Sequence, residues 1–236
     1  MLGKLLFNDT RLSHDNTISC ASCHNISEGG DDGQPVSTGI NGSRGTLNAP
    51  TVLNSSLSIA QFWDGRAKNL SAQIKSPIHS PIEMGSSWEE IVSKLRNDQS
   101  LADRFQHAFR SEISPTTIKA AIVSYEEALI TIDAPFDRYL TGEAEAISPK
   151  AIEGYRLFKS IGCISCHQGK TVGGNMFQQF GVLGSSGEYF DLANRSSKGR
   201  FNVTGRTVDL QRFKVPSLRN VERTAPYFHN GSVQNL

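Results

Sequence analysis

The sequence predicts a mainly α-helical protein built from two similar domains, joined by a hinge and carrying long irregular loops. The five-residue pattern Cys-x-x-Cys-His occurs twice, at residues 20–24 and 163–167, and these copies contain all 4 cysteines of the 236 residues. A second pattern, Gly-x-x-Leu-Phe, precedes each copy at Gly3–Phe7 and Gly154–Phe158, which indicates an internal repeat. Between the copies, apolar residues recur at helical spacing, and no stretch alternates as a strand would.

Length and charge limit the classes of protein that fit. A chain of 236 residues is long enough for one large domain or two ordinary ones. The 24 Lys and Arg residues nearly balance the 23 Asp and Glu residues, so the formal net charge of +1 argues against a nucleic acid or an anionic membrane surface as partner. No window is apolar enough to span a bilayer, and residues 1–7 do not resemble a signal peptide.

The repeat is interrupted in its first copy. Gly3 lies 17 residues before Cys20, whereas Gly154 lies 9 residues before Cys163. We therefore predict a loop insertion at about Asn8–Asn16 in the first domain.

Long Gly-rich segments follow each Cys-x-x-Cys-His pattern. Residues 28–48 contain six glycines and residues 169–206 contain eight. Loops of this length in a compact protein are usually functional. Between them, the Pro-rich segment 77–84 is predicted to be stiff and extended.

Start signals place four helices in the middle of the chain. Ser86 or Ser87, with a glutamate three residues later, opens a capping box. Ser114-Pro115 and Ser148-Pro149 each put a cap residue before a proline in the first turn. Apolar stripes follow these signals at 88–95, 101–109, 118–129 and 152–158. The segment 132–148 is the predicted hinge, so the domains are residues 1–132 and 133–236.

The Cys-x-x-Cys-His pattern is typical of covalent haem attachment. Two thiols three residues apart can add to the vinyl groups of one porphyrin, and the following histidine can ligate the iron. Two zinc knuckles or redox disulfides are the alternatives, but neither needs a histidine directly after the second cysteine in both copies. The predicted haem attachment residues are Cys20, Cys23, His24, Cys163, Cys166 and His167. Such cytochromes mature outside the bacterial cytoplasm, so we expect a periplasmic protein whose leader is absent from this chain.

The opposite face of each haem decides its chemistry, because a sixth protein ligand makes an electron carrier and an open face makes a reactive iron. The candidate ligands are His14, His79, His107, His229, Met84 and Met176. His14 and His107 fit surface positions better than ligation. Glu83 can move a proton between the two oxygens of a peroxide, with Gln73 as a hydrogen-bond donor, although the residues alone favour an ordinary exposed carboxylate at Glu83.

These residues, together with a series of ordered motifs, resemble a known family. The chain is similar to the bacterial dihaem cytochrome c peroxidases and their relatives, which include the dihaem enzyme that matures methylamine dehydrogenase. The similarity covers nearly all 236 residues. The matching motifs are Leu2–Phe7, Leu12-Ser13, Ile18–His24, Leu47–Thr51, Phe62–Ala67, Pro81–Met84, the second Cys-x-x-Cys-His pattern, Val215–Asn220 and Thr224–Gly231.

The resemblance implies different roles for the two haems. The haem on His24 would react with peroxide, and the haem on His167 would receive electrons. Glu83 falls on the family's catalytic glutamate and Gln73 on its distal-pocket glutamine. Trp63 falls on the tryptophan that lies between the two haems and offers a path for electrons.

The resemblance also implies a calcium ion between the domains. The matching ligands are the side chain of Asn48 and the backbone carbonyls of Thr224 and Pro226. An all-oxygen ligand set completed by water is ordinary calcium chemistry.

The chain departs from the family pattern in two places. Many members carry a histidine directly after Ser-Thr-Gly that blocks the peroxidatic iron until the other haem is reduced, whereas here Ser37-Thr38-Gly39 is followed by Ile40. We therefore expect the His24 haem to be open at rest. The methionine ligand expected for the second haem would lie beyond Leu236, so the chain is interpreted as C-terminally incomplete.

The predicted activity is reduction of hydrogen peroxide to water, with electrons from a small cytochrome c or a cupredoxin. One alternative is a dihaem oxidase of a protein or organic substrate, which Ile40 favours because that branch shares an open haem. The other alternative is a non-enzymatic dihaem electron carrier. A homodimer is left open as the assembly.

Overall fold

The computed structural model describes residues 1–181 and 193–236. It is mainly helical in these residues, as predicted. The helices are α1 (Leu2–Phe7), α2 (Cys20–Cys23), α3 (Leu70–Gln73), α4 (Lys75–His79), α5 (Trp88–Arg96), α6 (Gln99–Phe109), α7 (Pro115–Glu127), α8 (Pro135–Leu140), α9 (Pro149–Ser160) and α10 (Phe201–Thr204). No helix in the described parts is both long and apolar enough to cross a membrane.

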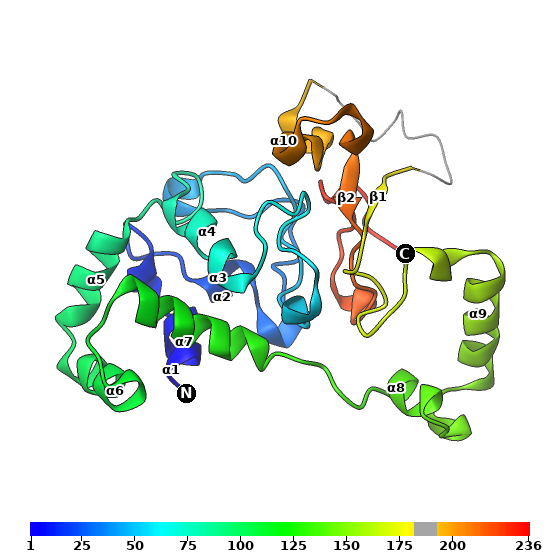
Figure 1. The fold of residues 1–236 in the computed structure, drawn as a ribbon, viewed down its shortest axis with the longest axis horizontal. Coiled ribbons are helices and arrows are strands. Elements are labelled where there is room, and N and C mark those ends of the chain that lie inside the picture. Colours follow the sequence, from blue (N-terminus) through cyan, green and yellow to red (C-terminus); the bar gives the residue numbers. More distant parts are fainter. Residues whose placement is uncertain (182–192) are drawn as a thin grey trace.

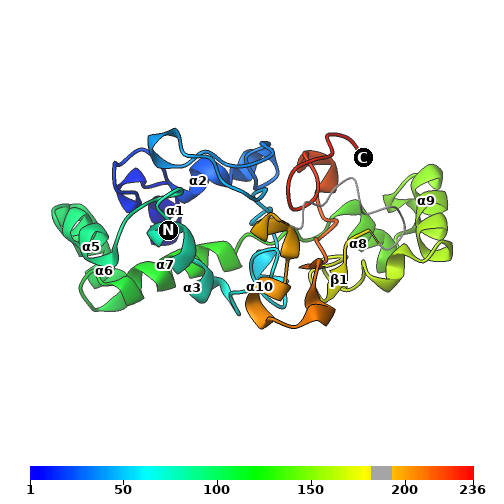
Figure 2. The same cartoon turned by 90° about the horizontal axis from the view of Figure 1, so that it is seen from above.

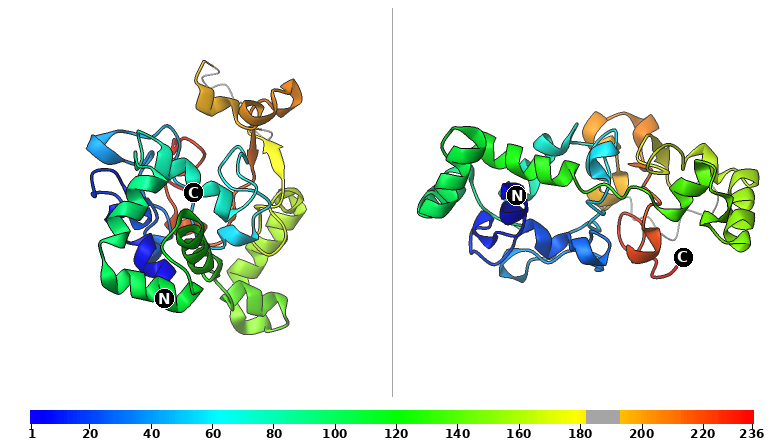
Figure 3. Two further views of the ribbon diagram at one scale, coloured as in Figure 1. Left: turned by 60° about the vertical axis from the view of Figure 1, so that its left-hand side comes forward. Right: turned by 90° about the horizontal axis from the view of Figure 1, so that it is seen from below.

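The molecule is elongated, with α5 and α6 at one end and α9 at the other (Figures 1 and 2). The view from below shows the same separation, with α10 and the strands between the ends (Figure 3, right). The C-terminal segment, drawn in red, runs beside the blue and cyan loops of the N-terminal half (residues 1–132). Loops from both halves therefore meet at the centre of the molecule.

The main hydrophobic core lies in the N-terminal half, where α1 crosses α7. A Cβ atom on Gly3 would collide with the carbonyl oxygen of Ala121, so only glycine allows the two helices this close an approach. Phe7 is fully buried and meets the ring of Tyr125 edge-on, with the centroids 5.3 Å apart. This contact, between residues over 100 positions apart, closes the fold around the segments that lie between them.

The predicted helix starts are confirmed. The side-chain oxygens of Ser87, Ser114 and Ser148 accept backbone N–H groups of α5, α7 and α9, respectively. The reciprocal capping box, however, forms at Ser114 with Thr117. At α5 the Glu90 carboxylate lies instead 2.8 Å from Lys94 Nζ, because that lysine is one turn away on the same face.

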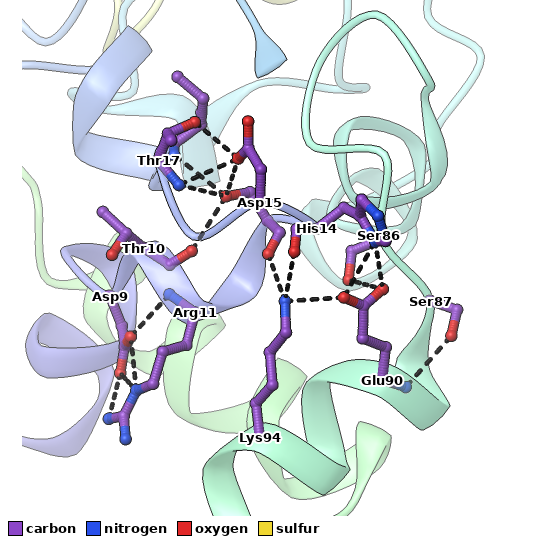
Figure 4. Close-up of polar contacts among 12 residues, drawn as sticks. Asp9, Thr10, Arg11, His14, Asp15, Thr17, Ser86, Ser87, Glu90 and Lys94 are labelled. Atoms are coloured by element: carbon purple, nitrogen blue, oxygen red, sulfur yellow. Dashed lines mark hydrogen bonds and ion pairs between the residues drawn. The ribbon is translucent and has the colours of Figure 1, made fainter. Parts of the chain in front are cut away.

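The predicted insertion at residues 8–16 is a loop held against α5 (Figure 4). Lys94 Nζ donates to the carbonyl oxygens of Ser13 and His14, at 2.7 and 2.8 Å. The His14 ring lies 3.1 Å from Glu90, and its side chain is 64% exposed. The loop is thus fixed by these polar contacts together with the burial of Leu12 in the hydrophobic core.

The prediction that residues 77–84 are extended is wrong. Pro77 lies inside α4, and the backbone of Met84 then turns back to donate to the Pro77 carbonyl oxygen at 3.1 Å. Pro77 is the third residue of this short helix, where its missing N–H has no helical partner to lose. The structure also contains two strands that were not predicted, β1 (Phe177–Gln179) and β2 (Arg212–Lys214), which pair antiparallel.

The C-terminal half (residues 133–236) is more open. The segment 132–148, predicted as a hinge, contains α8, and Phe136 of α8 packs edge-on against Tyr155 of α9 at 5.0 Å. No residue of α9 is fully buried, and Leu157 is 57% exposed. Whether 132–148 acts as a hinge between the two predicted domains stays a prediction.

Candidate functional site

The first Cys-x-x-Cys-His pattern borders a cavity in the N-terminal half. Cys20, Cys23 and His24 all line it. The remaining walls are mainly apolar and come from several elements, including Leu70 of α3 and Ile122 of α7. A flat, largely apolar group attached through the two thiols would therefore be enclosed by side chains from distant parts of the sequence.

His24 is held in one orientation by the loop that follows it. Its Nδ1 lies 3.2 Å from the carbonyl oxygen of Gly30, which can only accept, so Nδ1 carries the proton. Burial lowers the pKa of the His24 ring, which keeps it neutral. A neutral imidazole whose Nδ1–H is tied to a carbonyl leaves Nε2 as its metal-binding atom.

Glu83 and Gln73 line the same cavity as His24. Gln73 ends α3, and Glu83 lies in the turn after α4. Burial raises the pKa of the Glu83 carboxyl, and the nearby Arg66 guanidinium partly offsets this. The structure thus brings together three residues that the sequence analysis named from separate motifs.

Gly39 fixes the backbone at Glu83, a role that sequence analysis did not identify. A Cβ atom on Gly39 would lie 2.6 Å from the Glu83 carbonyl oxygen and would collide with that of Ile82. The next residue, Ile40, donates its N–H to the Glu83 carbonyl oxygen at 2.8 Å. The Ile40 side chain packs on Gly85 and is 5% exposed.

A second buried carboxyl, Glu126 of α7, also lines this cavity and was not predicted. Glu126 is 6% exposed, and its Oε2 has no hydrogen-bond partner. Burial raises the pKa of this carboxyl to about 7. The helical spacing contained the signal, because Glu126 lies four residues after the buried Ile122 and therefore on the same face of α7.

The second Cys-x-x-Cys-His pattern borders another cavity, in the C-terminal half. His167 lines it with aromatic and aliphatic residues that include Phe158 and Leu218. His167 Nδ1 lies 3.3 Å from the carbonyl oxygen of Val172, and burial lowers the pKa of its ring. Cys163 and Cys166 lie directly beside it, in and after a 3-10 turn. The arrangement repeats the one at His24, which agrees with the predicted repeat.

Trp63 is bonded to residues of both halves of the chain. It lines the first cavity, and its Nε1 donates to the carbonyl oxygen of Asn48 at 2.9 Å. Its own carbonyl oxygen accepts the N–H of Lys214 in β2, at 2.7 Å. The tryptophan is therefore fixed from both halves of the molecule.

The candidate sixth ligands occupy different environments. His107 is exposed on α6. His79 Nδ1 lies 3.1 Å from the Ser86 carbonyl oxygen. His229 is 1% exposed and stacks on Phe213 at 4.2 Å. Met84 lines the first cavity.

The residues proposed for calcium lie where loops of the two halves meet. Asn48 is buried, its Nδ2 donates to the Gln34 carbonyl oxygen at 2.9 Å, and its N–H donates to that of His229 at 2.8 Å. Thr224 and Pro226 follow a 3-10 turn in the same segment as His229. The described residues contain no group of three His, Cys, Asp or Glu side chains able to hold a metal ion, so carbonyl oxygens would have to supply most ligands of a cation here.

Comparisons with known proteins agree with the paired sites. Residues 1–145 match the family described as di-haem cytochrome c peroxidase. Cytochrome c551 peroxidase of Nitrosomonas europaea is 45% identical over 100% of this chain and 69% of that protein. Cytochrome c peroxidase Ccp of Escherichia coli is also 45% identical, and the chain spans 50% of its length. A crystal structure of a MauG-like protein associated with microbial copper homeostasis superposes with a TM-score of 0.88 at 33% identity, over 99% of this chain and 72% of that one.

Proposed function

This chain belongs to the di-haem cytochrome c peroxidase family, and from that premise we propose which of its residues carry out peroxide reduction. It is an oxidoreductase with two haems, and the relatives imply peroxide as substrate and a cytochrome as electron donor. Periplasmic location and a small cytochrome c or cupredoxin as donor are part of this proposal. The haems are assigned to Cys20, Cys23 and His24 and to Cys163, Cys166 and His167.

The residues at both cavities fit covalently attached haem. Each Cys-x-x-Cys-His pattern supplies two thiols three residues apart and a neutral histidine oriented by a backbone carbonyl. Each has a largely apolar cavity beside that histidine. Bound haem supplies one-electron redox chemistry and an iron to which peroxide can coordinate.

We assign proton transfer during peroxide cleavage to Glu83. A carboxyl whose pKa lies above its usual range can take a proton from one peroxide oxygen and return it to the other. Gln73 would hold the peroxide by an amide hydrogen bond. The observation that carries this assignment is that Glu83, Gln73 and His24 line one cavity.

Electrons would enter at the His167 haem and pass towards the His24 haem by way of Trp63. The support for this route is that Trp63 lines the first cavity while its backbone is bonded to β2 of the C-terminal half. The indole is also held by Asn48. A rigid ring between the two sites shortens the distance that each electron must cross.

The His24 haem is proposed to be open at rest. Ile40 cannot ligate iron, and its side chain packs on Gly85. A high-spin signal in the resting ferric spectrum would support this proposal. A wholly low-spin spectrum would contradict it and would favour the dihaem electron carrier.

The decisive experiment replaces Glu83 by Gln in the haem-loaded protein. We expect kcat for hydrogen peroxide to fall by about 10²–10⁴-fold, because a positioned proton-transfer group contributes a factor of that size. The optical spectrum should be nearly unchanged. Glu89→Gln, at an exposed position on α5, is the control and should retain turnover. Equal turnover in both variants would refute the assignment.

A second function, oxidation of a protein or organic substrate at the open haem, is favoured by Ile40 alone. Assays of the haem-loaded protein test this second function. Efficient peroxide turnover with a reduced cytochrome supports the peroxidase, and peroxide-dependent oxidation of an added protein or organic substrate without cytochrome oxidation supports the oxidase.

We also propose that calcium binds at Asn48, Thr224 and Pro226, between the two halves. Asn48 supports this placement because it contacts both sides of the junction through Gln34 and His229. Its carbonyl oxygen accepts the Trp63 indole N–H, so an ion there would steady the tryptophan as well.

A further inference from the structure

The carboxylate of Asp31 is buried without a cationic partner in the described residues. Asp31 is 2% exposed, and the backbone N–H groups of Asp31 and Gly33 approach its carboxylate without reaching good hydrogen-bond geometry. Burial raises the pKa of this carboxyl to about 6, so most of it is still ionised at neutral pH. A buried carboxylate is costly unless it is paired with a cation or coordinates a metal.

The backbone around Asp31 is held firmly. The Asp31 carbonyl oxygen accepts the N–H of Asn25 at 2.9 Å. The carbonyl oxygen of Gly30 accepts the N–H of Val52 at 3.0 Å, and that of Gly29 accepts the Thr51 hydroxyl at 2.6 Å. The side chain therefore has little freedom to turn out into water.

Asp31 lies close to the backbone of the C-terminal segment. The position that a Cβ atom on Gly29 would occupy lies 3.2 Å from Asp31 Oδ1 and 2.8 Å from the Arg223 carbonyl oxygen, so these two oxygens are at most about 6 Å apart. The corresponding position on Gly33 lies 4.0 Å from the Ala225 carbonyl oxygen. Carbonyl oxygens can only accept, so a cation between them and the carboxylate would stabilise both.

The same loop approaches the proposed calcium ligands. Gln34 accepts the Asn48 side chain, and a Cβ atom on Gly231 would collide with Pro35. Residues 29–35 thus lie between Asn48 and residues 223–231. Asp31 forms no ion pair with a lysine or arginine in the described residues.

We propose that Asp31 is the carboxylate ligand, directly or through one water, of a calcium ion bound between residues 29–35 and 223–226. This inference rests on the proposed calcium site and not on the peroxide chemistry. It adds a charged ligand to Asn48, Thr224 and Pro226, which supply neutral oxygens only. Because affinity for calcium rises with the number of charged ligands, Asp31 would set the strength of the site.

The proposed ion would also affect the orientation of His24, because the two are connected through the backbone of Gly30. Gly30, the residue before Asp31, provides the carbonyl oxygen that holds His24 Nδ1. Ion binding would therefore fix the acceptor that orients the His24 ring, and removal of the ion would loosen it.

Calcium titration of the haem-loaded protein, stripped with a chelator and followed by calorimetry, tests the proposal. We expect Asp31→Asn to weaken calcium binding by about tenfold or more, since it removes the charge while keeping the shape. Asp32→Asn is the matched control because it makes the same change of charge one residue away. Asp32 accepts from the Gln34 N–H, which asparagine also can do, so its calcium affinity should stay within about twofold of the parent's.

Thermal unfolding gives a second, independent measurement. In chelator, Asp31→Asn should be at least as stable as the parent, because a buried unpaired charge is gone. In saturating calcium the parent should become the more stable of the two. Equal calcium affinity in Asp31→Asn and the parent would overturn the proposal, and so would a parent that binds no calcium. Neither result would affect peroxide turnover by the parent, so the proposed peroxidase function is judged separately.

Discussion

At the scale of single residues, the titration of Glu126 should change the free energy of unfolding with pH. Its pKa is raised from 4.5 to about 7 by burial, so the native state holds the proton more tightly than the unfolded chain does. The stability that Glu126 contributes is therefore fully present below pH 4.5 and is lost as the pH rises towards 7, by up to about 3 kcal/mol. Above pH 7 this contribution is constant.

Glu126→Gln should remove that dependence. Relative to the parent, the variant should gain stability between pH 5 and pH 8, measured by guanidinium unfolding of the haem-loaded protein. Glu127→Gln changes the neighbouring, exposed glutamate, and its stability should match that of the parent over the same pH range. Parallel pH profiles for Glu126→Gln and the parent would show that the carboxyl is not strained by burial.

Residue identities at the site could be predicted where chemistry demands a fixed spacing. The thiols and His24 follow from the Cys-x-x-Cys-His pattern, Glu83 and Gln73 were named together from the chemistry of peroxide cleavage, and the family resemblance then favoured that role. The positions of Gly39 and Asp31 could not be predicted. Their roles depend on contacts with Glu83 and Arg223, which the chain brings close only after folding.

At the scale of elements, the first glycines of the two Gly-x-x-Leu-Phe copies, Gly3 and Gly154, should respond in opposite ways to substitution. Gly3 of α1 leaves no room for a Cβ atom against Ala121, whereas the corresponding position on Gly154 of α9 has no atom within 4 Å. Gly3→Ala should destabilise the protein by about 1–3 kcal/mol through overpacking. Gly154→Ala, which faces the second cavity, should stay within about 1 kcal/mol of the parent. Urea unfolding of both variants compares them, and losses of equal size would contradict the close crossing of α1 and α7.

Helix starts were predictable because a cap acts within four residues of sequence. The side chains of Ser87, Ser114 and Ser148 each accept a backbone N–H group that lies three residues later in the sequence. The strands β1 and β2 were not predictable, since three residues hold no period and the pairing of Phe177 with Lys214 is tertiary. Pro77 misled the prediction because a proline is tolerated in the first turn of a helix as well as in an extended segment.

At the scale of the whole molecule, Arg219 joins the end of the N-terminal half to several parts of the C-terminal half. Its guanidinium lies 2.6 Å from Asp137 of α8, and it donates to the carbonyl oxygens of Thr131 and Lys170, at 3.2 and 2.6 Å. These partners lie at the end of the N-terminal half, in α8 and in the loop after His167. A planar fork of donors can satisfy all of them at once, which a lysine cannot.

Arg219→Lys should therefore lower the free energy of unfolding by about 1–3 kcal/mol, the range for hydrogen bonds to charged groups. Arg219 also lowers the pKa of the Asp137 carboxyl, so the pair stabilises the protein above the usual titration range of an aspartate and this part is lost on acidification. The difference between variant and parent should accordingly shrink as the pH falls towards 3. Arg138→Lys is the control, because Arg138 pairs only with the exposed Glu143 at 3.2 Å and such surface pairs contribute about 0–1 kcal/mol. If both variants lose the same small amount at neutral pH, Arg219 does not hold these segments together and the C-terminal half is organised by its haem instead.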